Sequence, residues 1–219
     1  MGNVLITGAG SGLGRSLALT YAKAGHTVYL AGRTESKLLL VQKELKESGC
    51  RGEVLICDVS EPASVEEALK QLDSLEVLIN NAGLGIFGEL SSYSSEDIDQ
   101  LLHTNVKGTI IATQMAHPLL KRAQGRVLNI ISTAGLRGKT NESVYCASKF
   151  AVRGFTESLH KEWENDPVSA TAVYMGGMNT PFWEESTHVK DPSSMKNPDP
   201  VAKQIIDEDD GREAIYIDR

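Results

Sequence analysis

Residues 4–14 read VLITGAGSGLG, and this stretch decides how the rest of the chain is interpreted. Its first four residues form a short apolar run of the kind that becomes a buried strand. Four glycines follow within the next seven residues, and apolar side chains then recur at three- and four-residue spacing as far as Ala24. Gly25 is the expected C-terminal cap of this helix, because glycine tolerates the left-handed conformation that such caps require. The stretch predicts a strand, a glycine-rich turn and a helix.

The same alternation of short apolar runs and helix-length segments continues along the chain. Apolar runs that alternate with helices indicate a parallel sheet that is covered on both faces. We therefore expect one doubly wound α/β domain of three layers. The predicted strands are residues 4–7, 27–31, 54–57, 77–79, 127–131, 169–174 and 214–217. The predicted helices are residues 13–24, 35–48, one opened by Glu61-Pro62, one with a capping box at Ser94 and Asp97, and residues 106–122, 143–165 and 200–207.

Composition and charge are those of an ordinary globular domain spanning residues 1–219. The chain has 41% hydrophobic and 23% charged residues, and no stretch approaches about 20 consecutive apolar residues. With no basic leader before the first strand, we expect a soluble cytoplasmic protein that does not bind membranes. The net charge of −7 has the wrong sign for a general nucleic-acid or anionic-membrane binder. The acidic run at 207–211 is interpreted as a solvated turn.

Cysteine and histidine patterns predict neither a disulfide framework nor a metal site. The three cysteines form no even set and no Cys-x-x-Cys pair, so they are expected to be reduced thiols. The five histidines show no spacing that would place two ligands on one helical face.

The glycine-rich turn is a candidate phosphate site, because the N-terminus of the following helix presents unpaired N–H groups and a positive dipole. Gly8 would allow the tight turn, Gly12 would let the backbone approach a pyrophosphate, and Gly14 would let the helix pack closely. The spacing is Gly-x-x-x-Gly-x-Gly rather than G-x-G-x-x-G. The alternative is a glycine-rich turn that binds nothing. The candidate cofactor residues in this turn are Gly8, Ser11, Gly12, Leu13 and Gly14.

The end of the second predicted strand bears on the choice of cofactor. An acidic residue expected about 20 positions after the glycine turn would bind the adenosine ribose, but residues 30–34 read LAGRT. Gly32 leaves space, and the Arg33 guanidinium could bind a 2′-phosphate in a bidentate manner. The sequence therefore favours NADP(H) over NAD(H), with a surface arginine as the alternative.

Tyr145 and Lys149 lie four residues apart, and hence on one face of a predicted helix. A tyrosine can exchange protons near neutral pH only if its pKa of about 10 falls by about 3 units, or roughly 4 kcal/mol. An ammonium about 4 Å away supplies that much only where the effective dielectric constant is near 20, so the pair would have to lie in a cleft. The alternative is a solvated helix face.

Two polar residues complete the candidate catalytic set. Ser132 follows the fifth predicted strand, where ligand sites of such sheets are expected, and its hydroxyl could hold a carbonyl oxygen. An ordinary loop serine is the alternative. Asn105 lies between two helix-length segments, where it could otherwise be a cap or kink residue.

These segments, in this order, resemble the short-chain dehydrogenase/reductase family. The resemblance covers about residues 4–218 and rests on residues 7–14, Asp58-Val59, residues 80–83, Asn105, Ser132, and Tyr145 with Lys149. It implies a Rossmann-type sheet of seven strands. It also implies reversible hydride transfer between a nicotinamide cofactor and an alcohol or carbonyl substrate.

The resemblance also implies a role for each matching residue. Tyr145 looks like the general acid/base, and Lys149 would lower its pKa and bind the nicotinamide ribose. Ser132 would orient the substrate oxygen, and Asn105 would support a water that links Lys149 to solvent. The remaining cofactor contacts would be Asp58 and Val59 to adenine, Asn81, Ala82 and Gly83 on the ribose side, and Thr180 to the carboxamide. Family members pack as dimers or tetramers, which here implies a homodimer or homotetramer formed through residues 106–122 and 143–165.

Two departures from the family pattern concern the substrate end. Met175 stands where the family usually has proline, so the φ restriction of proline is absent. The segment 181–200, which would be the lid over the substrate, is short. Met178, Phe182 and Trp183 are candidate lid side chains, with core packing as the alternative, and the sequence offers no partner for His188.

The sequence thus predicts an NADP(H)-dependent carbonyl reductase or alcohol dehydrogenase acting on a small molecule. The alternative from another class is a cofactor-binding regulatory protein with little turnover, to which the short lid and Met175 would be suited. An epimerase or dehydratase on the same fold is a third interpretation, but the glycine spacing and short chain favour a simple reductase.

Overall fold

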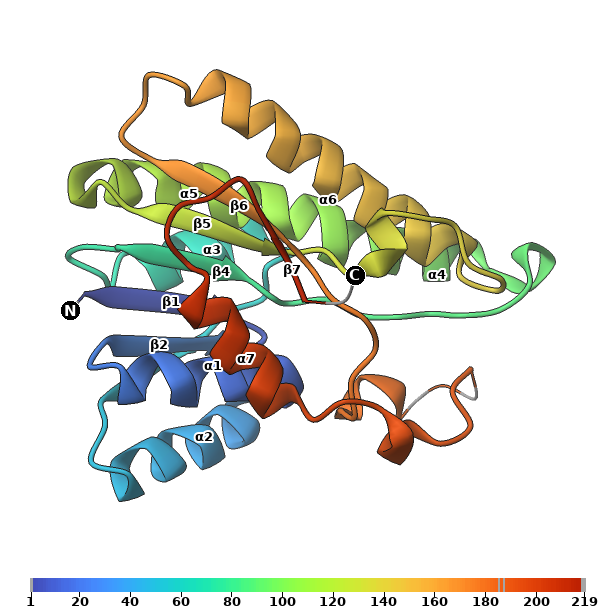
Figure 1. Ribbon diagram of the computed structural model, residues 1–219, viewed down its shortest axis with the longest axis horizontal. Helices are drawn as coiled ribbons and strands as arrows, with labels where there is room; N and C mark the ends of the chain where they lie inside the picture. Colours follow the sequence, from blue (N-terminus) through green and yellow to red (C-terminus); the bar gives the residue numbers. More distant parts are fainter. Residues whose placement is uncertain (1, 185, 187, 218–219) are drawn as a thin grey trace.

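Seven parallel strands form one sheet in the order β3-β2-β1-β4-β5-β6-β7 (Figure 1). The computed structural model describes residues 2–184, 186 and 188–217, and the statements below concern these residues. All seven predicted strands are confirmed, with ends that shift by one or two residues. Their bounds are Asn3–Thr7 (β1), Thr27–Gly32 (β2), Gly52–Ile56 (β3), Val77–Asn80 (β4), Arg126–Ile130 (β5), Ser169–Tyr174 (β6) and Ala214–Tyr216 (β7).

The direction of strand addition reverses at β1. The chain first builds outward from β1 to β2 and β3, and then returns to place β4 on the other side of β1. In an open parallel sheet, such a reversal leaves a crevice at the carboxyl ends of the two central strands, since their following connections run to opposite faces. The topology therefore fixes where a ligand site is expected.

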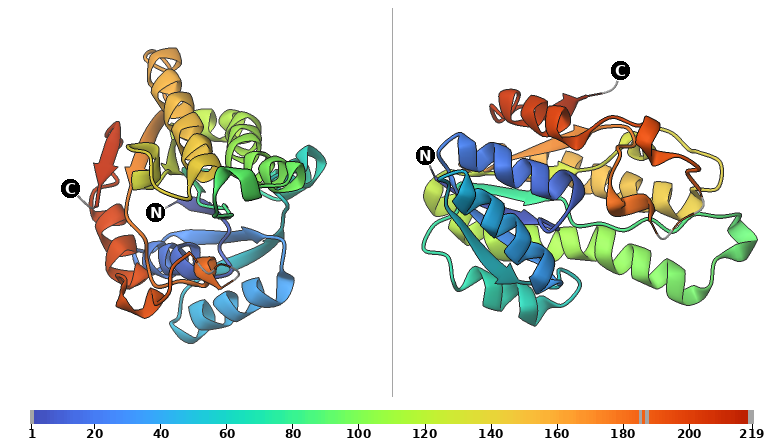
Figure 2. Two further views of the ribbon diagram at one scale, coloured as in Figure 1. Left: turned by 90° about the vertical axis from the view of Figure 1, so that its right-hand side faces the viewer. Right: turned by 90° about the horizontal axis from the view of Figure 1, so that it is seen from below.

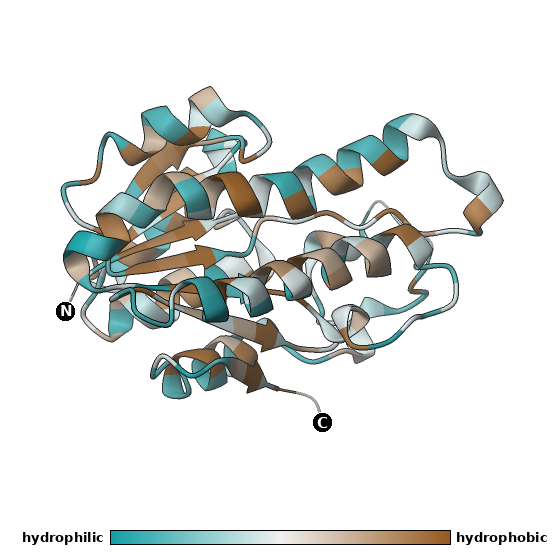
Figure 3. Ribbon diagram, turned by 90° about the horizontal axis from the view of Figure 1, so that it is seen from above, coloured by the Kyte–Doolittle hydropathy of each residue, from teal (hydrophilic) through white to brown (hydrophobic). Residues whose placement is uncertain are grey.

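Helices cover both faces of the sheet, as predicted (Figure 2). Apolar side chains of β1 alternate between the two layers: Val4 and Ile6 pack with α1, α2 and α7, whereas Leu5 packs with α3 and α5. Figure 3 shows the strands as largely hydrophobic and the surrounding helices as carrying both hydrophobic and hydrophilic residues. The helices are Gly12–Lys23 (α1), Glu35–Glu47 (α2), Pro62–Leu69 (α3), Ser95–Leu102 (α4), Gly108–Ala123 (α5), Ser143–Glu162 (α6) and Pro198–Asp207 (α7).

Local signals set several helix ends. The capping box at Ser94 and Asp97 is present, and Pro62 occupies the first turn of α3. Gly25, the predicted C-terminal cap of the first helix, has a φ of +93°, and Gly49, which follows the predicted helix 35–48, has a φ of +73°. Among the described residues, no helix combines the length and hydropathy needed to cross a membrane.

The segment around Asn105 differs from the prediction of a helix that starts at residue 106. A π-helical turn, His103–Lys107, joins α4 directly to α5. Periodicity alone could not reveal this turn, because one extra residue in a helical turn leaves the apolar spacing on either side intact. Such π turns occur often at functional sites.

The acidic run at residues 207–211 is not simply a solvated turn. The Asp209 side chain is only 1% exposed, and its carboxylate forms two hydrogen bonds with the Arg126 guanidinium, at 2.5 and 2.7 Å. It also accepts a hydrogen bond from the Tyr21 hydroxyl at 2.5 Å. The turn after α7 is therefore joined to α1 and β5 by buried polar contacts.

We expect Asp209→Ala to lower the free energy of unfolding by about 2–3 kcal/mol, because it leaves a largely buried guanidinium and a buried hydroxyl without their acceptor. Urea denaturation would measure the change. Asp210→Ala is the matched control, since the neighbouring carboxylate pairs with Arg212 at the surface and should contribute much less. Equal losses in the two variants would contradict this account.

Candidate active site

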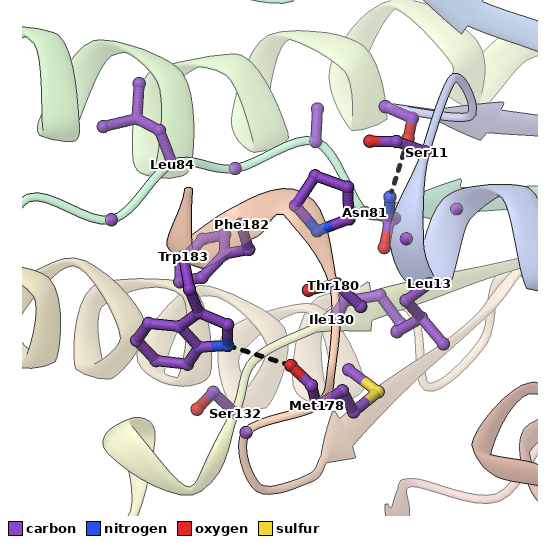
Figure 4. A pocket seen from close by; sticks show the side chains of 18 of the residues that line it. Ser11, Leu13, Asn81, Leu84, Ile130, Ser132, Met178, Thr180, Phe182 and Trp183 are labelled. Carbon is purple, nitrogen blue, oxygen red and sulfur yellow. Dashed lines mark hydrogen bonds between the residues drawn. The ribbon is translucent and has the colours of Figure 1, made fainter. Parts of the chain in front are cut away.

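A cavity of about 410 Å³ opens at the carboxyl ends of the central strands (Figure 4). Its walls come from the glycine turn after β1, the loop after β4, the end of β5, the face of α6 that carries Tyr145, and the segment after β6. These elements lie far apart in the sequence. The parallel sheet brings them together because every one of them follows, or packs against, a strand end on the same edge.

The glycine turn is as close-packed as the sequence predicts. Gly8 has a φ of +66°, and a Cβ there would lie 2.9 Å from Cα of Ala82. A Cβ on Gly14 would lie 2.2 Å from the carbonyl oxygen of Gly8. No other residue fits either position without moving backbone atoms. Gly12, Leu13 and Gly14 begin α1 and also line the cavity, so the N-terminal turn of this helix borders it.

Asn81 clamps the glycine turn to the loop after β4. Its side-chain amide donates hydrogen bonds to the carbonyl oxygens of Thr7, at 3.0 Å, and Gly8, at 3.3 Å. In return, the Thr7 hydroxyl accepts from the backbone N–H groups of Asn81 and Ala82, both at 3.0 Å. These contacts hold the two central loops in a fixed relation. Asn81, Ala82 and Gly83 all line the cavity, as does Thr180, whose side chain lies next to Gly12.

Two cations lie at the end of the cavity near β2. Arg33 was expected there, and its side chain is 61% exposed, with Nη1 at 4.0 Å from Oδ2 of Asp58. Lys37, in the first turns of α2, also lines the cavity and was not predicted. Asp58 and Val59 are not among the described residues that line it. The Asp58 carboxylate instead accepts hydrogen bonds from the backbone and hydroxyl of Ser60.

Tyr145 and Lys149 lie on one face of α6, as predicted, and both are buried in the cavity wall, with exposures of 8% and 7%. The Lys149 Nζ atom is 5.8 Å from the centre of the tyrosine ring and donates a hydrogen bond to the Ile130 carbonyl at 3.0 Å. Burial lowers the pKa of Lys149 to about 8. The side chain is therefore mostly charged at neutral pH.

The pKa of Tyr145 differs from the prediction that a nearby ammonium would lower it. Burial raises the pKa of the phenol, and a hydrogen bond with Ser132 only partly opposes this effect. The prediction considered the attraction between phenolate and ammonium but omitted the cost of removing a phenolate from water. The raised pKa keeps the proton on the phenol at neutral pH but also makes the phenol a weaker acid, so proton donation depends on a neighbouring cation that stabilises the phenolate.

Ser132 faces Tyr145 from a strained backbone. Its φ is +90°, a region that costs a residue with a Cβ about 1–3 kcal/mol. The Ser132 hydroxyl accepts a hydrogen bond from the Ala134 N–H at 3.2 Å, and it lines the cavity. The strain is confined to the residue that brings a hydroxyl next to the buried phenol.

Asn105 lies behind the cavity rather than at its surface. Its amide oxygen accepts from the Leu84 N–H, and its nitrogen donates to the Leu84 carbonyl, both at 2.9 Å. The same nitrogen donates to the Ser148 hydroxyl at 3.2 Å. A Cβ on Gly83 would lie 3.3 Å from the Asn105 oxygen and 3.8 Å from the Lys149 Nζ atom, so the three residues are neighbours. Asn105 thereby joins the loop after β4 to α6.

The segment after β6 forms an aromatic wall at the substrate end. Met178, Phe182 and Trp183 line the cavity, and the Trp183 indole donates a hydrogen bond to the Met178 carbonyl at 2.9 Å (Figure 4). Phe182 also packs against Tyr145, so it contributes both to the wall and to a small apolar cluster. The predicted lid, 181–200, includes residues 185 and 187, which lie outside the described residues.

Met175 begins this segment from a fixed position although it lacks a proline ring. Its side chain is buried in the core, and its carbonyl oxygen accepts a hydrogen bond from the Thr133 N–H at 2.8 Å. The sequence analysis missed three further residues near this wall. They are Phe87, Lys139 and Glu142, and the position of Glu142 directly before the helix of Tyr145 was the only available signal.

Comparisons with known proteins agree with this geometry. A family model described as short chain dehydrogenase matches residues 2–191. A sepiapterin reductase from Chlorobaculum tepidum is 34% identical over 192 residues, covering 82% of this chain and 79% of that protein. An alcohol dehydrogenase from Thermococcus sibiricus, solved with 5-hydroxy-NADP, has a TM-score of 0.89 at 25% identity and covers 99% of this chain and 96% of its own. A short-chain dehydrogenase/reductase from Burkholderia phymatum, solved with NAD, has the same TM-score and identity and covers 98% and 88%.

The buried Lys149 should make stability depend on pH in a predictable direction. Its pKa is lower in the folded chain, about 8, than the ordinary value of 10.5. The unfolded chain therefore binds the proton more tightly, and wild-type stability should rise with pH in this window. Relative to Lys149→Met, the wild-type protein should gain about 2–3 kcal/mol between pH 7 and pH 10.

Urea denaturation of both proteins at the two pH values measures this gain. Lys161→Met, which replaces an exposed lysine of the same helix, serves as the control. A difference between wild type and Lys149→Met that stays constant with pH would show that Lys149 is not desolvated.

Proposed function

This chain belongs to the short-chain dehydrogenase/reductase family and is an oxidoreductase, and we propose that it interconverts a carbonyl compound and an alcohol with NADP(H). One observation carries the proposal. A buried phenol, a facing hydroxyl and a buried ammonium share one cavity with a glycine turn at a helix N-terminus. A proton donor and an anion-binding turn in the same cavity are what a nicotinamide-dependent reductase requires.

The residues present fit a nicotinamide dinucleotide. Close packing against Ala82 and within the turn itself excludes side chains at Gly8 and Gly14, and this packing fixes the shape of the turn that lines the cavity. The first turn of α1 offers N–H groups and a positive dipole for a pyrophosphate, although the chain as a whole is acidic. The dinucleotide, when bound, supplies or accepts the hydride.

Arg33 supports a preference for NADP(H) over NAD(H). Both Arg33 and Lys37 line the cavity at the β2 end, where the adenosine ribose would lie, and Gly32 stands in place of an acidic residue. A guanidinium can hold a phosphate through two parallel hydrogen bonds. Asp58 lies 4.0 Å from the guanidinium, so it orients Arg33 without forming a close ion pair.

Tyr145 is proposed to donate the proton to the carbonyl oxygen during reduction and to accept it during oxidation. Burial keeps the phenol protonated at neutral pH, which favours the reductive direction. Ser132 would hold the substrate oxygen beside the phenol, and the Lys149 ammonium would stabilise the phenolate left after transfer. Asn105 would act by positioning the loop after β4 against α6.

The substrate end of the cavity supports a carbonyl compound with an apolar group beside the reacting carbon. Leu84, Phe182 and Trp183 supply its walls, and Met178 adds a further apolar side chain. The similar proteins have names that imply different substrates, a sepiapterin and an alcohol. The lining of the cavity is therefore the better guide to the substrate of this chain.

Exposed apolar side chains support a homodimer or homotetramer. Ile110 and Phe150 are exposed on α5 and α6, the helices for which the family resemblance implies packing between copies, and Leu102 is exposed at the end of α4. Burial of such side chains between copies would stabilise an assembly.

A cofactor-binding regulatory protein with little turnover is the second candidate. Its motivation was the short lid and Met175. The hydrogen bond from Thr133 to Met175 weakens that argument, because it fixes the start of the segment that covers the cavity. A binding protein would also have no need for a buried phenol next to a strained serine.

Replacing Tyr145 tests the proposed proton transfer. Tyr145→Phe removes only the hydroxyl, so we expect kcat to fall by about 10²- to 10⁴-fold while NADPH affinity stays nearly constant. NADPH oxidation with a panel of aldehydes and ketones measures turnover, and calorimetry measures binding. Tyr29→Phe, on β2 and away from the cavity, is the control. Wild-type rates in Tyr145→Phe would overturn the assignment, and tight NADPH binding by a protein that reduces no carbonyl would favour the regulatory alternative.

Replacing Arg33 tests the choice of cofactor. Arg33→Ala should raise the Kd for NADPH by about 10- to 100-fold, because a charge-assisted hydrogen bond to phosphate contributes about 1.5–3 kcal/mol. The Kd for NADH should change much less. Arg51→Ala, an exposed arginine outside the cavity, is the control. Equal weakening of both cofactors by Arg33→Ala would contradict a 2′-phosphate contact.

A further inference from the structure

A hydrogen bond joins the segment after β6 to the residue before α6. The His188 Nε2 atom lies 3.1 Å from Oε1 of Glu142. The other carboxylate oxygen, Oε2, lies 3.7 Å from the Nζ atom of Lys139. Glu142 is 7% exposed, lines the cavity and precedes Tyr145 by three residues. The buried Glu142 carboxylate thus has two basic partners, and one of them, His188, belongs to the segment after β6.

An aromatic stack forms a second connection between the same parts. The His188 ring stacks on Phe87, with centres 4.7 Å apart and planes 20° apart. Phe87 in turn stacks on Trp183, at 5.3 Å, and meets the Tyr145 ring edge-on, also at 5.3 Å. His188 is thus linked to the proton donor through a carboxylate on one side and through an aromatic ring on the other.

We propose that His188 and Glu142 are positioning residues whose contact holds Trp183 and Phe87 against the substrate end of the cavity. Neither is required to touch the reacting atoms. His188 is the one of these groups that lies in the segment after β6 and contacts the carboxylate before α6. Its loss would remove this polar link between the segment and α6, while Phe182 still packs on Tyr145 and Lys139 still pairs with Glu142. The kinetic consequence rests on the proposed function, whereas the placement of Trp183 does not.

We expect the position of Trp183 to depend on this contact, because the other contacts of Trp183 described next lie within the segment after β6. Trp183 is held to Met178 by its indole hydrogen bond, and Met178 pairs with Lys196 in an isolated parallel bridge. These contacts fix the segment within itself. The hydrogen bond between His188 and Glu142 adds to the packing of Phe182 on Tyr145 in holding the segment against α6. Because Glu142 is buried, water competes with this hydrogen bond less than it would at the surface.

Tryptophan fluorescence tests the placement without any turnover. The chain has two tryptophans, and Trp163 stacks on His117 beyond α6. In a Trp163→Phe background, Trp183 is the only emitter. We expect His188→Ala to shift its emission to longer wavelength and to raise its quenching by acrylamide, because the indole becomes more exposed to water. His188→Gln, which can still donate to Glu142, should recover part of the wild-type signal.

Steady-state kinetics tests the consequence at the site. His188→Ala and Glu142→Gln should each raise KM for the carbonyl substrate by about tenfold, as expected for losing an interaction of about 1.4 kcal/mol. His188→Ala should leave kcat and the Kd for NADPH nearly unchanged, and the double variant should be no worse than the poorer single one. Glu157→Gln, which removes an exposed ion pair on the same helix, is the matched control.

The outcomes separate this proposal from the proposed function. Unchanged Trp183 emission and quenching in His188→Ala would overturn the contact as a positioning element, whatever the activity. Effects of the two variants on KM that multiply in the double variant would overturn the coupling between them. A wild-type protein that reduces no carbonyl compound would remove the proposed function, and the fluorescence result would then still decide the placement. Thermal melting of each variant confirms that the chain is folded.

Discussion

Two ionisable side chains that are buried together, Tyr145 and Lys149, set the conditions for the rest of the site. Removing a phenolate and an ammonium from water disfavours both charged forms, which raises the pKa of Tyr145 and lowers that of Lys149. The Ile130 carbonyl accepts a hydrogen bond from the ammonium and offsets part of its desolvation. Burial thus opposes proton loss from the phenol, and the neighbouring ammonium, which keeps most of its charge at neutral pH, is the group in place to stabilise the phenolate.

Several residues with unusual backbone geometry or packing lie in or behind the cavity wall. Ser132 has a positive φ, Asn105 lies in a π-helical turn, and Gly8 and Gly14 leave no room for a Cβ. Each of these features costs stability locally. Two apolar layers pack on opposite faces of the sheet, and one of them reaches the cavity through Leu13 and Met175. Their burial supplies the stability against which such strain can be maintained.

The features that the sequence predicted are those that local patterns encode. Strand and helix periodicity gave the sheet and its layers, and the four-residue spacing of Tyr145 and Lys149 placed both on one face of α6. Contacts between distant loops were missed, because no period relates His188 to Glu142. The prediction of a solvated turn was wrong for Asp209, because a run of acidic residues does not show which carboxylate is buried against Arg126. The pKa of Tyr145 was misjudged because desolvation depends on burial, which only the assembled chain defines.

At Met175, tertiary contacts take the place of the φ restriction that a proline would impose. Proline would fix φ at this point, whereas here the Met175 carbonyl accepts the Thr133 N–H and its side chain is buried in the core. Thr133 directly follows the strained Ser132, so the turn that carries the hydroxyl and the start of the covering segment are hydrogen-bonded to each other. A displacement of the segment at Met175 would therefore be transmitted to Ser132 by one intervening residue. The position of the hydroxyl relative to Tyr145 and the position of the aromatic wall are consequently coupled, even though Ser132 and Met175 are 43 positions apart in the chain.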